Sequence, residues 1–591
     1  MQKRNDIQIL RALAVIFVVL FHLEVGGIES GFLGVDVFFV VSGFLMAILY
    51  KTGETKKFFE RRAKRLLPAY FTTVVITLIA SIFIVLPSEL GQVATQSIYS
   101  LFFANNFGFW MQNSYFSKTD FNPLLHLWSL GVEIQFYLIV PILVWFFRKS
   151  KIFLPIILIG SFLSCVFVVG ISPKTSFFIM PLRIWEFLIG FIVAYYLTNN
   201  GNIKTQKYQW LGLSGLIILC AIPFINVDGQ SLNRLEAHPS FYALLVCLST
   251  SLVLSFGLPK ILEDSIFGQF LAKIGDYSYS IYLVHFPIIV LYLYKPFSGT
   301  ILYPESYKDK TILLILIIFF SVLIHRLIEI RKFHSISKVY ITSLISLSLL
   351  VGCTKVVPYI YNQESQNIFN ALSDRATFRC GKYRKFTHPN EISCKINNEN
   401  FEQSILLIGD SHTDSIKVSF AEVASMNKYN TYLNFSNEVF TDESITPEML
   451  INEAKKLKIE KIVMHFSAKR FNPKMIHKIE KLAKIAKENN ININIILPIP
   501  FYNESVPKIV YEEKVLSKYD KNTYLDNNKD ILKKIKEIEY IKAFDVYQVF
   551  CQPKCLIANN NYYPLYFDSN HLNLTGAKKL IPIFKRVIEN Q

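Results

Sequence analysis

Long apolar stretches dominate the first 358 residues of the chain. Such stretches of roughly 17–22 residues recur there, which is the length that an α-helix needs to cross a bilayer core. We predict eleven membrane-spanning helices, at 7–24, 33–50, 67–86, 126–147, 152–171, 176–197, 208–226, 241–256, 278–294, 311–329 and 338–358. A shorter apolar stretch at 95–109 is not counted. The pattern therefore predicts a polytopic α-helical membrane domain.

The pattern changes after residue 358. Residues 359–403 are polar and predict a linker or cap, and from 404 onward short apolar runs alternate with helical patterns. Strands are predicted at 404–408, 430–435, 460–466, 491–497 and 541–546, and helices near 412–426, 446–458, 473–489, 529–538 and 575–588. This alternation is typical of a doubly wound parallel sheet with helices on both faces. We therefore divide the chain into a membrane domain (1–335), an eleventh span with a linker (336–403) and an α/β domain (404–591).

Composition and charge agree with a membrane location. The chain is 52% hydrophobic and has a formal net charge of +17. Lys and Arg are concentrated in alternate loops starting from the N-terminus, so the positive-inside rule places the N-terminus in the cytoplasm. An odd number of spans then places the α/β domain outside. Topology accounts for the positive charge, and we expect neither a nucleic-acid partner nor a metal, because zinc-type and RNA-binding signatures are missing from the sequence.

The eight cysteines form two groups. Four lie in predicted spans, where we expect buried free thiols, and four lie in the exported part of the chain, which can hold disulfides. The first group is Cys165, Cys220, Cys247 and Cys353. For the second group we favour the local pairs Cys380–Cys394 and Cys551–Cys555 over the two other connectivities, with free thiols as the alternative.

Two short motifs in the α/β domain can build a nucleophilic site. Gly409-Asp410-Ser411-His412 follows an apolar strand and precedes a helix, which places Ser411 at the carboxyl edge of the sheet. In Asp568-Ser569-Asn570-His571, an aspartate stands three residues before a histidine. His571 would act as the base for Ser411, Asp568 would orient His571, and the Ser411 backbone N–H could stabilise an oxyanion. Each motif alone is more often a turn or a helix cap, but their positions at the first strand and the last helix favour catalysis.

Residues 404–591 resemble the SGNH hydrolase family through these same residues. That family has Gly-Asp-Ser after a strand and Asp-x-x-His before the last helix. It also uses a glycine and an asparagine from middle blocks as oxyanion donors. The third predicted strand is followed by Phe466-Ser467-Ala468-Lys469-Arg470, which departs from the Gly-x-Asn pattern.

Ionisable side chains inside spans are costly, so each is a functional candidate. These residues are Arg11, His22, Asp36, Glu133, Arg183 and Glu186. The predicted topology puts four of them toward the outer side, where they could line one cavity, namely His22, Asp36, Glu133 and Arg183. The alternative is a set of buried ion pairs that hold helices together, which we favour for Arg183 and Glu186. In the first cytoplasmic loop, Arg62 and Arg65 could grip the phosphates of coenzyme A, although the loop's charge also has a topogenic role.

Residues 1–335 resemble the acyltransferase-3 family of integral membrane acyltransferases. The matching stretches are Arg11-Ala12-Leu13-Ala14 with His22, Gly34 to Phe39 with Ser42-Gly43-Phe44, Arg61 to Arg65 with Pro68, His126 to Leu130 with Glu133 and Tyr137, and Tyr277 to Leu283 with His285 and Pro287. Members with an eleventh span and a fused SGNH domain resemble bacterial O-acetyltransferases of surface glycans.

The resemblance implies a donor, an acceptor and residue roles. Acetyl-CoA would bind on the cytoplasmic side with Arg11, Arg62 and Arg65, and His22 would be the essential intramembrane histidine, supported by Glu133 or Asp36. The acceptor would be an envelope carbohydrate outside the bacterial inner membrane: O-antigen or another lipopolysaccharide sugar, capsule or peptidoglycan. The oligomeric state is not implied.

Several functions remain open from the sequence. In the first, the membrane domain delivers acetyl to Ser411, which passes it to a sugar hydroxyl. In the second, the membrane domain completes the transfer near His22 and the α/β domain positions the glycan. A membrane-anchored glycan esterase and a transporter are alternatives from other classes.

Overall fold

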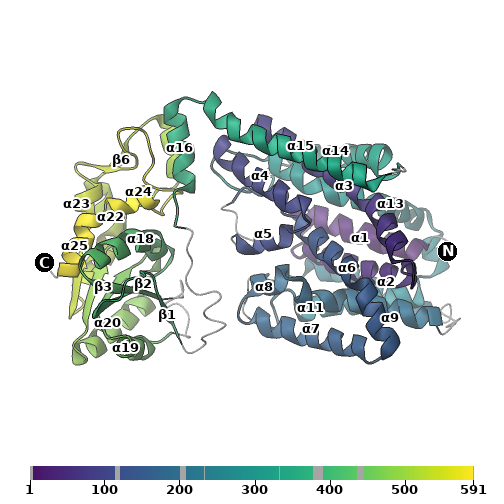
Figure 1. Cartoon of the computed structure of the whole chain (residues 1–591), viewed down its shortest axis with the longest axis horizontal. Coiled ribbons are helices and arrows are strands. Elements are labelled where there is room, and N and C mark those ends of the chain that lie inside the picture. Colours follow the sequence, from purple (N-terminus) through teal and green to yellow (C-terminus); the bar gives the residue numbers. More distant parts are fainter. Residues whose placement is uncertain are drawn as a thin grey trace. The chain divides into compact units, whose positions relative to one another are not determined.

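The computed structural model of the chain describes residues 4–112, 120–199, 208–229, 231, 233–331, 333, 335–376, 391–434 and 445–589. The chain forms two compact units, Met1–Val357 and Pro358–Gln591 (Figure 1). We call them the membrane unit and the C-terminal unit and describe each by itself.

The membrane unit is entirely helical in its described part. Seven segments are long and apolar enough to cross a membrane. They contain α1 (Asn5–His22), α2 (Gly34–Leu49), α3 (Thr55–Ile84), α6 (Leu127–Lys149), α13 (Ile266–Tyr292), α14 (Tyr307–Ile324) and α15 (Ile336–Val356). Four shorter apolar helices coincide with the other predicted spans: α7 (Phe153–Val169), α9 (Ile184–Asn199), α10 (Gln209–Ala221) and α11 (Phe241–Phe256). A polytopic helical domain is therefore confirmed, while the count of eleven spans stays a prediction.

The doubtful apolar stretch at 95–109 falls on two helices, α4 (Pro87–Leu101) and α5 (Asn105–Met111). The buried side of α4 includes the polar residues Glu89, Gln96, Ser97 and Ser100, and Gln96 donates to the backbone carbonyl of Phe121 at 2.8 Å. This polar face fixes the segment that leads into α6.

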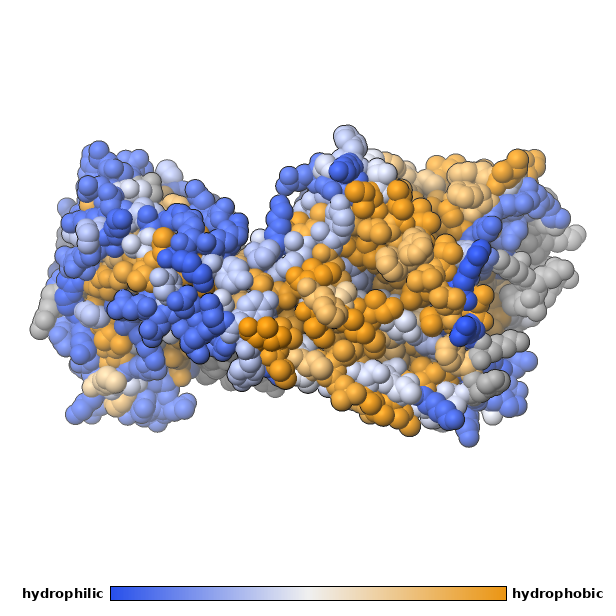
Figure 2. Space-filling view, turned by 90° about the horizontal axis from the view of Figure 1, so that it is seen from above, coloured by the Kyte–Doolittle hydropathy of each residue, from blue (hydrophilic) through white to orange (hydrophobic). Residues whose placement is uncertain are grey.

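The outer surface of the membrane unit is apolar. Large side chains such as Phe83, Ile315 and Leu349 are exposed, at 84%, 60% and 66% of their surface. Figure 2 shows hydrophobic residues over much of this unit's visible face, whereas hydrophilic residues dominate the visible face of the C-terminal unit. An exposed apolar belt on a helical unit is what contact with lipid requires.

Glycines bring α2 and α9 into close contact. A Cβ atom built on Gly43 would lie 1.9 Å from the carbonyl oxygen of Phe187, and one built on Gly190 would lie 1.9 Å from that of Val40. Small residues allow such close helix packing within a membrane. The contact fixes the two helices that carry Asp36 and Glu186.

A six-stranded sheet forms the centre of the C-terminal unit. Its order is β1-β3-β2-β4-β5-β7, with β1 (Ser393–Lys395), β2 (Gln403–Gly409), β3 (Tyr429–Asn434), β4 (Ile459–His465), β5 (Asn492–Ile496) and β7 (Ile541–Phe544). All neighbours are parallel except β1, which is antiparallel to β3. A small second sheet pairs β6 (Ser517–Asp520) with β8 (Lys554–Leu556).

Helices cover both faces of the six-stranded sheet, which confirms the predicted α/β class. The helices α19 (Pro447–Lys456), α20 (Pro473–Glu488) and α22 (Lys521–Lys536) share one hydrophobic core with the sheet. The helix α18 (Ser411–Met426) packs against β2 and β3, and α24 (Leu574–Lys578) and α25 (Ile581–Glu589) pack against α18. All five predicted strands are present, whereas β1 and the helix α16 (Gln363–Ser373) lie in the stretch predicted as a linker.

The cysteines largely follow the prediction. Cys551 and Cys555 form a disulfide, and the four cysteines of the membrane unit are free. Cys220 and Cys353 are exposed on the apolar outer surface rather than buried, which corrects the expectation of buried thiols. The predicted pair Cys380–Cys394 involves Cys380, which lies outside the described residues.

Candidate active site

Ser411 stands where β2 ends and α18 begins. The Asp410 carboxylate caps α18 by accepting a hydrogen bond from the backbone N–H of His412 at 2.9 Å, and Ser411, the first residue of the helix, is exposed. The turn is tight because Gly409 approaches β4, where a Cβ atom on Gly409 would lie 2.0 Å from the carbonyl oxygen of His465. Only glycine fits there. The local sequence thus presents the hydroxyl at the carboxyl edge of the sheet, as predicted.

Ser411, His571 and Asp568 form a continuous hydrogen-bonded triad. The Oγ atom of Ser411 lies 2.7 Å from Nε2 of His571, and Nδ1 of His571 lies 2.7 Å from Oδ2 of Asp568. A carboxylate only accepts, so Nδ1 carries the proton and Nε2 is left as the base. These are the distances that a nucleophile and its base require. The structure therefore brings together all three residues predicted for this site.

The surroundings of Asp568 keep it ionised. Burial alone would raise the pKa of the Asp568 carboxyl, but the hydrogen bond and charge of His571 lower that pKa below its ordinary value. The backbone N–H groups of Asn570 and His571 also donate to Oδ1 of Asp568, at 2.9 and 2.7 Å. An ionised Asp568 holds the His571 ring in one tautomer and stabilises the imidazolium that forms when Ser411 loses its proton.

The His571 ring is held between two other rings. Phe567 stacks on it with a centroid separation of 5.4 Å and an interplanar angle of 6°, and the His412 ring lies 4.7 Å away. His412 is 3% exposed, and its Nε2 accepts from the side-chain amide of Asn570 at 3.3 Å. Burial, together with His571 and His465, lowers the pKa of His412 well below its ordinary value. No role was predicted for His412, although it directly follows Ser411.

The stretch predicted as a linker braces the histidine end of the triad. The Asp374 side chain accepts from the backbone N–H and the hydroxyl of Thr575, at 3.0 and 2.7 Å, and its backbone carbonyl accepts from Leu574. The Arg375 guanidinium lies 5.0 Å from the centre of the Phe567 ring, which itself stacks on His571. We call Asp374 and Arg375 the brace. The polar composition of residues 359–403 did not indicate that Asp374 and Arg375 contact the triad region.

The described residues after the middle strands do not identify the glycine and asparagine donors of an oxyanion hole. The backbone N–H of Ser467, just after β4, donates to Oδ2 of Asp410 at 3.0 Å and is therefore already used. The segment 435–444 after β3 lies outside the described residues. The Ser411 N–H at the start of α18 keeps the position expected of an oxyanion donor.

In the membrane unit, His22 packs against a second histidine. His22 ends α1 and is 2% exposed, and its ring lies 5.3 Å from that of His285 on α13. The ring of His126, just before α6, lies 5.5 Å from His285. All three histidines belong to stretches quoted above for the membrane domain, but only His22 was given a role.

Glu133 and the three predicted arginines form a separate cluster. Glu133 accepts hydrogen bonds from Ser42 and Tyr137. Arg11 interacts electrostatically with Arg65 and Glu133, and Arg62 with the same two residues, so Glu133 lies with the arginines and not with the outer-side residues it was expected to join. Arg11 precedes His22 by eleven residues on α1, which corresponds to about 16 Å along the helix axis.

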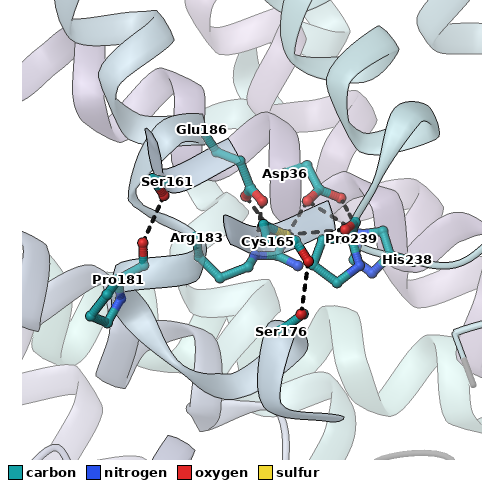
Figure 3. Close-up of polar contacts among 9 residues, drawn as sticks. All are labelled: Asp36, Ser161, Cys165, Ser176, Pro181, Arg183, Glu186, His238 and Pro239. Carbon is teal, nitrogen blue, oxygen red and sulfur yellow. Dashed lines mark hydrogen bonds and ion pairs between the residues drawn. The ribbon is translucent and has the colours of Figure 1, made fainter. Parts of the chain in front are cut away.

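Asp36 and Arg183 belong to a third, fully buried cluster (Figure 3). Arg183 pairs with Asp36 at 2.7 Å and with Glu186 at 2.8 Å, and His238 lies 3.0 Å from Asp36. The ion-pair alternative therefore holds for Arg183 and Glu186. The four residues expected to line one cavity fall into three groups in the structure: Asp36 pairs with Arg183, Glu133 bonds to Ser42 and Tyr137, and His22 packs against His285.

Comparisons with known proteins agree with both halves of the chain. Residues 4–328 match the model of the acyltransferase domain family, and residues 379–586 match that of the SGNH domain fused to AT3 domains. The O-acetyltransferase OatA of Staphylococcus aureus is 31% identical over 48% of this chain and 50% of its own length. The peptidoglycan O-acetyltransferase OatA of Listeria monocytogenes is 33% identical over 48% and 49%.

The chain thus spans about half the length of these curated relatives. A solved structure titled as the periplasmic domain of a lipopolysaccharide acetyltransferase from Salmonella ser. Paratyphi A aligns at 19% identity. It covers 31% of this chain and 82% of that chain, with a TM-score of 0.24. The acyltransferase family model covers more than half of the chain. The chain therefore belongs to the acyltransferase domain family, in the form that carries a fused SGNH domain.

Proposed function

We propose that this protein is an O-acetyltransferase that moves acetyl groups from acetyl-CoA to hydroxyls of an envelope glycan, with an acetyl ester on Ser411 as intermediate. One observation carries the proposal: a complete Ser411–His571–Asp568 triad is joined in one chain to an acyltransferase membrane unit. The names of the two OatA relatives support an acetyl donor, and the Listeria relative makes peptidoglycan the first acceptor to test.

The donor would be held by the membrane unit. The arginine cluster offers positive charge to the phosphates of coenzyme A, and Nε of Arg62 is buried without a hydrogen-bond partner among the described residues. The positive-inside rule puts this end in the cytoplasm of a bacterial inner membrane and the C-terminal unit outside. His22, about 16 Å further along α1, would then meet the thioester end of a long donor.

The chemistry at Ser411 would proceed in two steps. His571 Nε2 takes the Ser411 proton as Oγ attacks the acetyl carbonyl, and the previous carrier of the acetyl group leaves with that proton. A sugar hydroxyl then attacks the acetyl ester while His571 removes its proton, and Ser411 is released with the proton returned. No metal is needed in either step.

Acetyl analysis of the glycan tests the proposal. Cells that carry Ser411→Ala or His22→Ala in the full chain should lose the acetyl ester from their peptidoglycan, measured by mass spectrometry of the isolated glycan. His477→Gln is the control, because the His477 side chain is 80% exposed and distant in sequence from both motifs. Full acetylation in Ser411→Ala would exclude the ester intermediate and favour completion of the transfer in the membrane unit.

The same experiment addresses the esterase alternative, because a triad of this geometry can also hydrolyse esters. An esterase predicts more glycan acetyl in Ser411→Ala than in the wild type, whereas a transferase predicts less. If neither peptidoglycan nor any other envelope glycan changes its acetyl content in either variant, the proposed function is refuted.

A further inference from the structure

Three histidines from distant parts of the sequence meet inside the membrane unit. The His285 ring lies 5.3 Å from that of His22 and 5.5 Å from that of His126, and the Phe286 ring packs on His22 and His126 at 5.1 and 5.4 Å. The exposed fractions of the three histidines are 2%, 2% and 0%. We call His22, His126 and His285 the histidine cluster.

Hydrogen bonds fix the tautomer of two of these rings. Nδ1 of His285 lies 2.7 Å from the carbonyl oxygen of Tyr282, and Nε2 of His126 lies 3.0 Å from that of Leu283. A carbonyl can only accept, so these nitrogens carry the protons. In the neutral rings, Nε2 of His285 and Nδ1 of His126 are then left with lone pairs. Both atoms are buried and have no hydrogen-bond partner among the described residues.

A purely structural role would leave this arrangement unexplained. Buried polar atoms are nearly always hydrogen-bonded, and each exception calls for a reason. A hydrophobic side chain could fill either place without leaving such an atom. Nε2 of His285 and Nδ1 of His126 are basic nitrogens that receive no hydrogen bond from the described residues, and both rings belong to the same cluster as His22. Such nitrogens are suited to accept a proton during a reaction.

We propose that the histidine cluster is the acyl-transfer centre of the membrane unit, with His22 as acetyl carrier, His285 as the proton acceptor for His22, and His126 as a positioning residue for His285. The inference rests on the proposed function and adds residues and a step to it. A nitrogen of His22 attacks the thioester carbonyl, a C–N bond forms and the C–S bond breaks. The proton shed by the His22 ring passes to Nε2 of His285 and then to the leaving thiolate, so that acetyl-His22 and free coenzyme A result.

The two carboxylates expected to support His22 have other partners in the structure. Asp36 is held by Arg183 and His238, and Glu133 by Ser42 and Tyr137, so both acids have other contacts. The His126 ring lies edge-on to the His285 ring, with the centroids 5.5 Å apart and an interplanar angle of 74°, which fits a residue that fixes the His285 ring.

The test uses the purified full chain in detergent with Ser411→Ala, so that an acetyl group on His22 is not passed on. Radiolabelled acetyl-CoA is added without acceptor, and coenzyme A release and protein-bound label are followed over time. His285→Asn keeps an amide donor for the Tyr282 carbonyl but has no basic nitrogen. We expect the rate of the first turnover to fall by roughly 10²–10⁴-fold, with the acetyl-CoA concentration for half-maximal rate unchanged.

A second variant separates chemistry from folding. His285→Ala leaves a space of about one ring, and added imidazole should restore part of the rate, which a structural defect would not allow. His22→Ala should abolish the protein-bound label. The control His477→Gln should acylate at the same rate as the protein that keeps His477. If the His285→Asn variant becomes acylated at the same rate as the protein with His285, the proposed role of His285 is overturned. A protein with intact His22 and His285 that releases no coenzyme A would instead overturn the proposed function itself.

Discussion

The buried imidazole of His412 should make the C-terminal unit sensitive to acid. Its pKa is well below the ordinary 6.5 in the folded unit because the ring is buried beside His571 and His465, with Asp568 as the opposing charge. In the unfolded chain His412 titrates normally. Below pH 6.5 the unfolded state therefore binds a proton that the folded state does not, so the free energy of unfolding decreases as the pH falls.

The size of this effect follows from the ordinary pKa alone. If the folded ring stays neutral, lowering the pH from 7 to 5 costs about 2 kcal/mol from this one group. His412→Gln can still accept from Asn570 but cannot titrate, so its loss of stability over the same interval should be smaller than that of the wild type by about 2 kcal/mol. His477→Gln, at an exposed position, should match the wild type.

Hydrogen exchange followed by mass spectrometry is the suitable assay. All five tryptophans lie in the membrane unit, so tryptophan fluorescence will not report on the C-terminal unit. Protection of the α18 peptides, corrected for the intrinsic pH dependence of exchange, gives the local free energy of unfolding at each pH. Equal acid sensitivity of the wild type and His412→Gln would refute the reasoning.

Three further substitutions should act through single contacts. Asp36→Asn leaves the fully buried Arg183 short of a negative partner, and we expect a loss of about 3–5 kcal/mol, seen as less folded protein after detergent extraction. Asp374→Ala removes both bonds to Thr575 and should destabilise the C-terminal unit by about 1–2 kcal/mol in the same exchange assay, whereas Asp374→Asn should lose less. Gly409→Ala would place a Cβ atom 2.0 Å from a β4 carbonyl oxygen, so acetyl transfer should fall even where the protein still folds.

Sequence periodicity predicted which helices and strands are present more accurately than it predicted where the helices begin. The five predicted strands of the α/β domain lie within two residues of the observed ones at every end, because buried parallel strands are short, continuous apolar runs. The helix predicted from 529 begins at Lys521, since Asp520 caps it by accepting from the Thr523 N–H. The span predicted from 278 begins at Ile266, because α13 continues through polar residues that hydropathy alone excludes.

The triad could be predicted because its residues stand in two short motifs at fixed points of the fold. The contacts around it could not, because they join residues far apart in the chain: Asn570 to His412, and Thr575 to Asp374. The same holds in the membrane unit. Asp36 stands close to His22 in the sequence, at the start of the next long helix, yet pairing over 147 residues with Arg183 draws Asp36 into another cluster.

The brace has a consequence for any attempt to isolate the C-terminal unit of this protein. The family match to the SGNH domain starts at residue 379, just past Asp374 and Arg375. A fragment cut there would free the start of α24 and the outer face of Phe567, even though every triad residue would still be present. A fragment that starts at Pro358 retains α16 and the brace, and is the one in which serine reactivity can be compared fairly with that of the full-length protein.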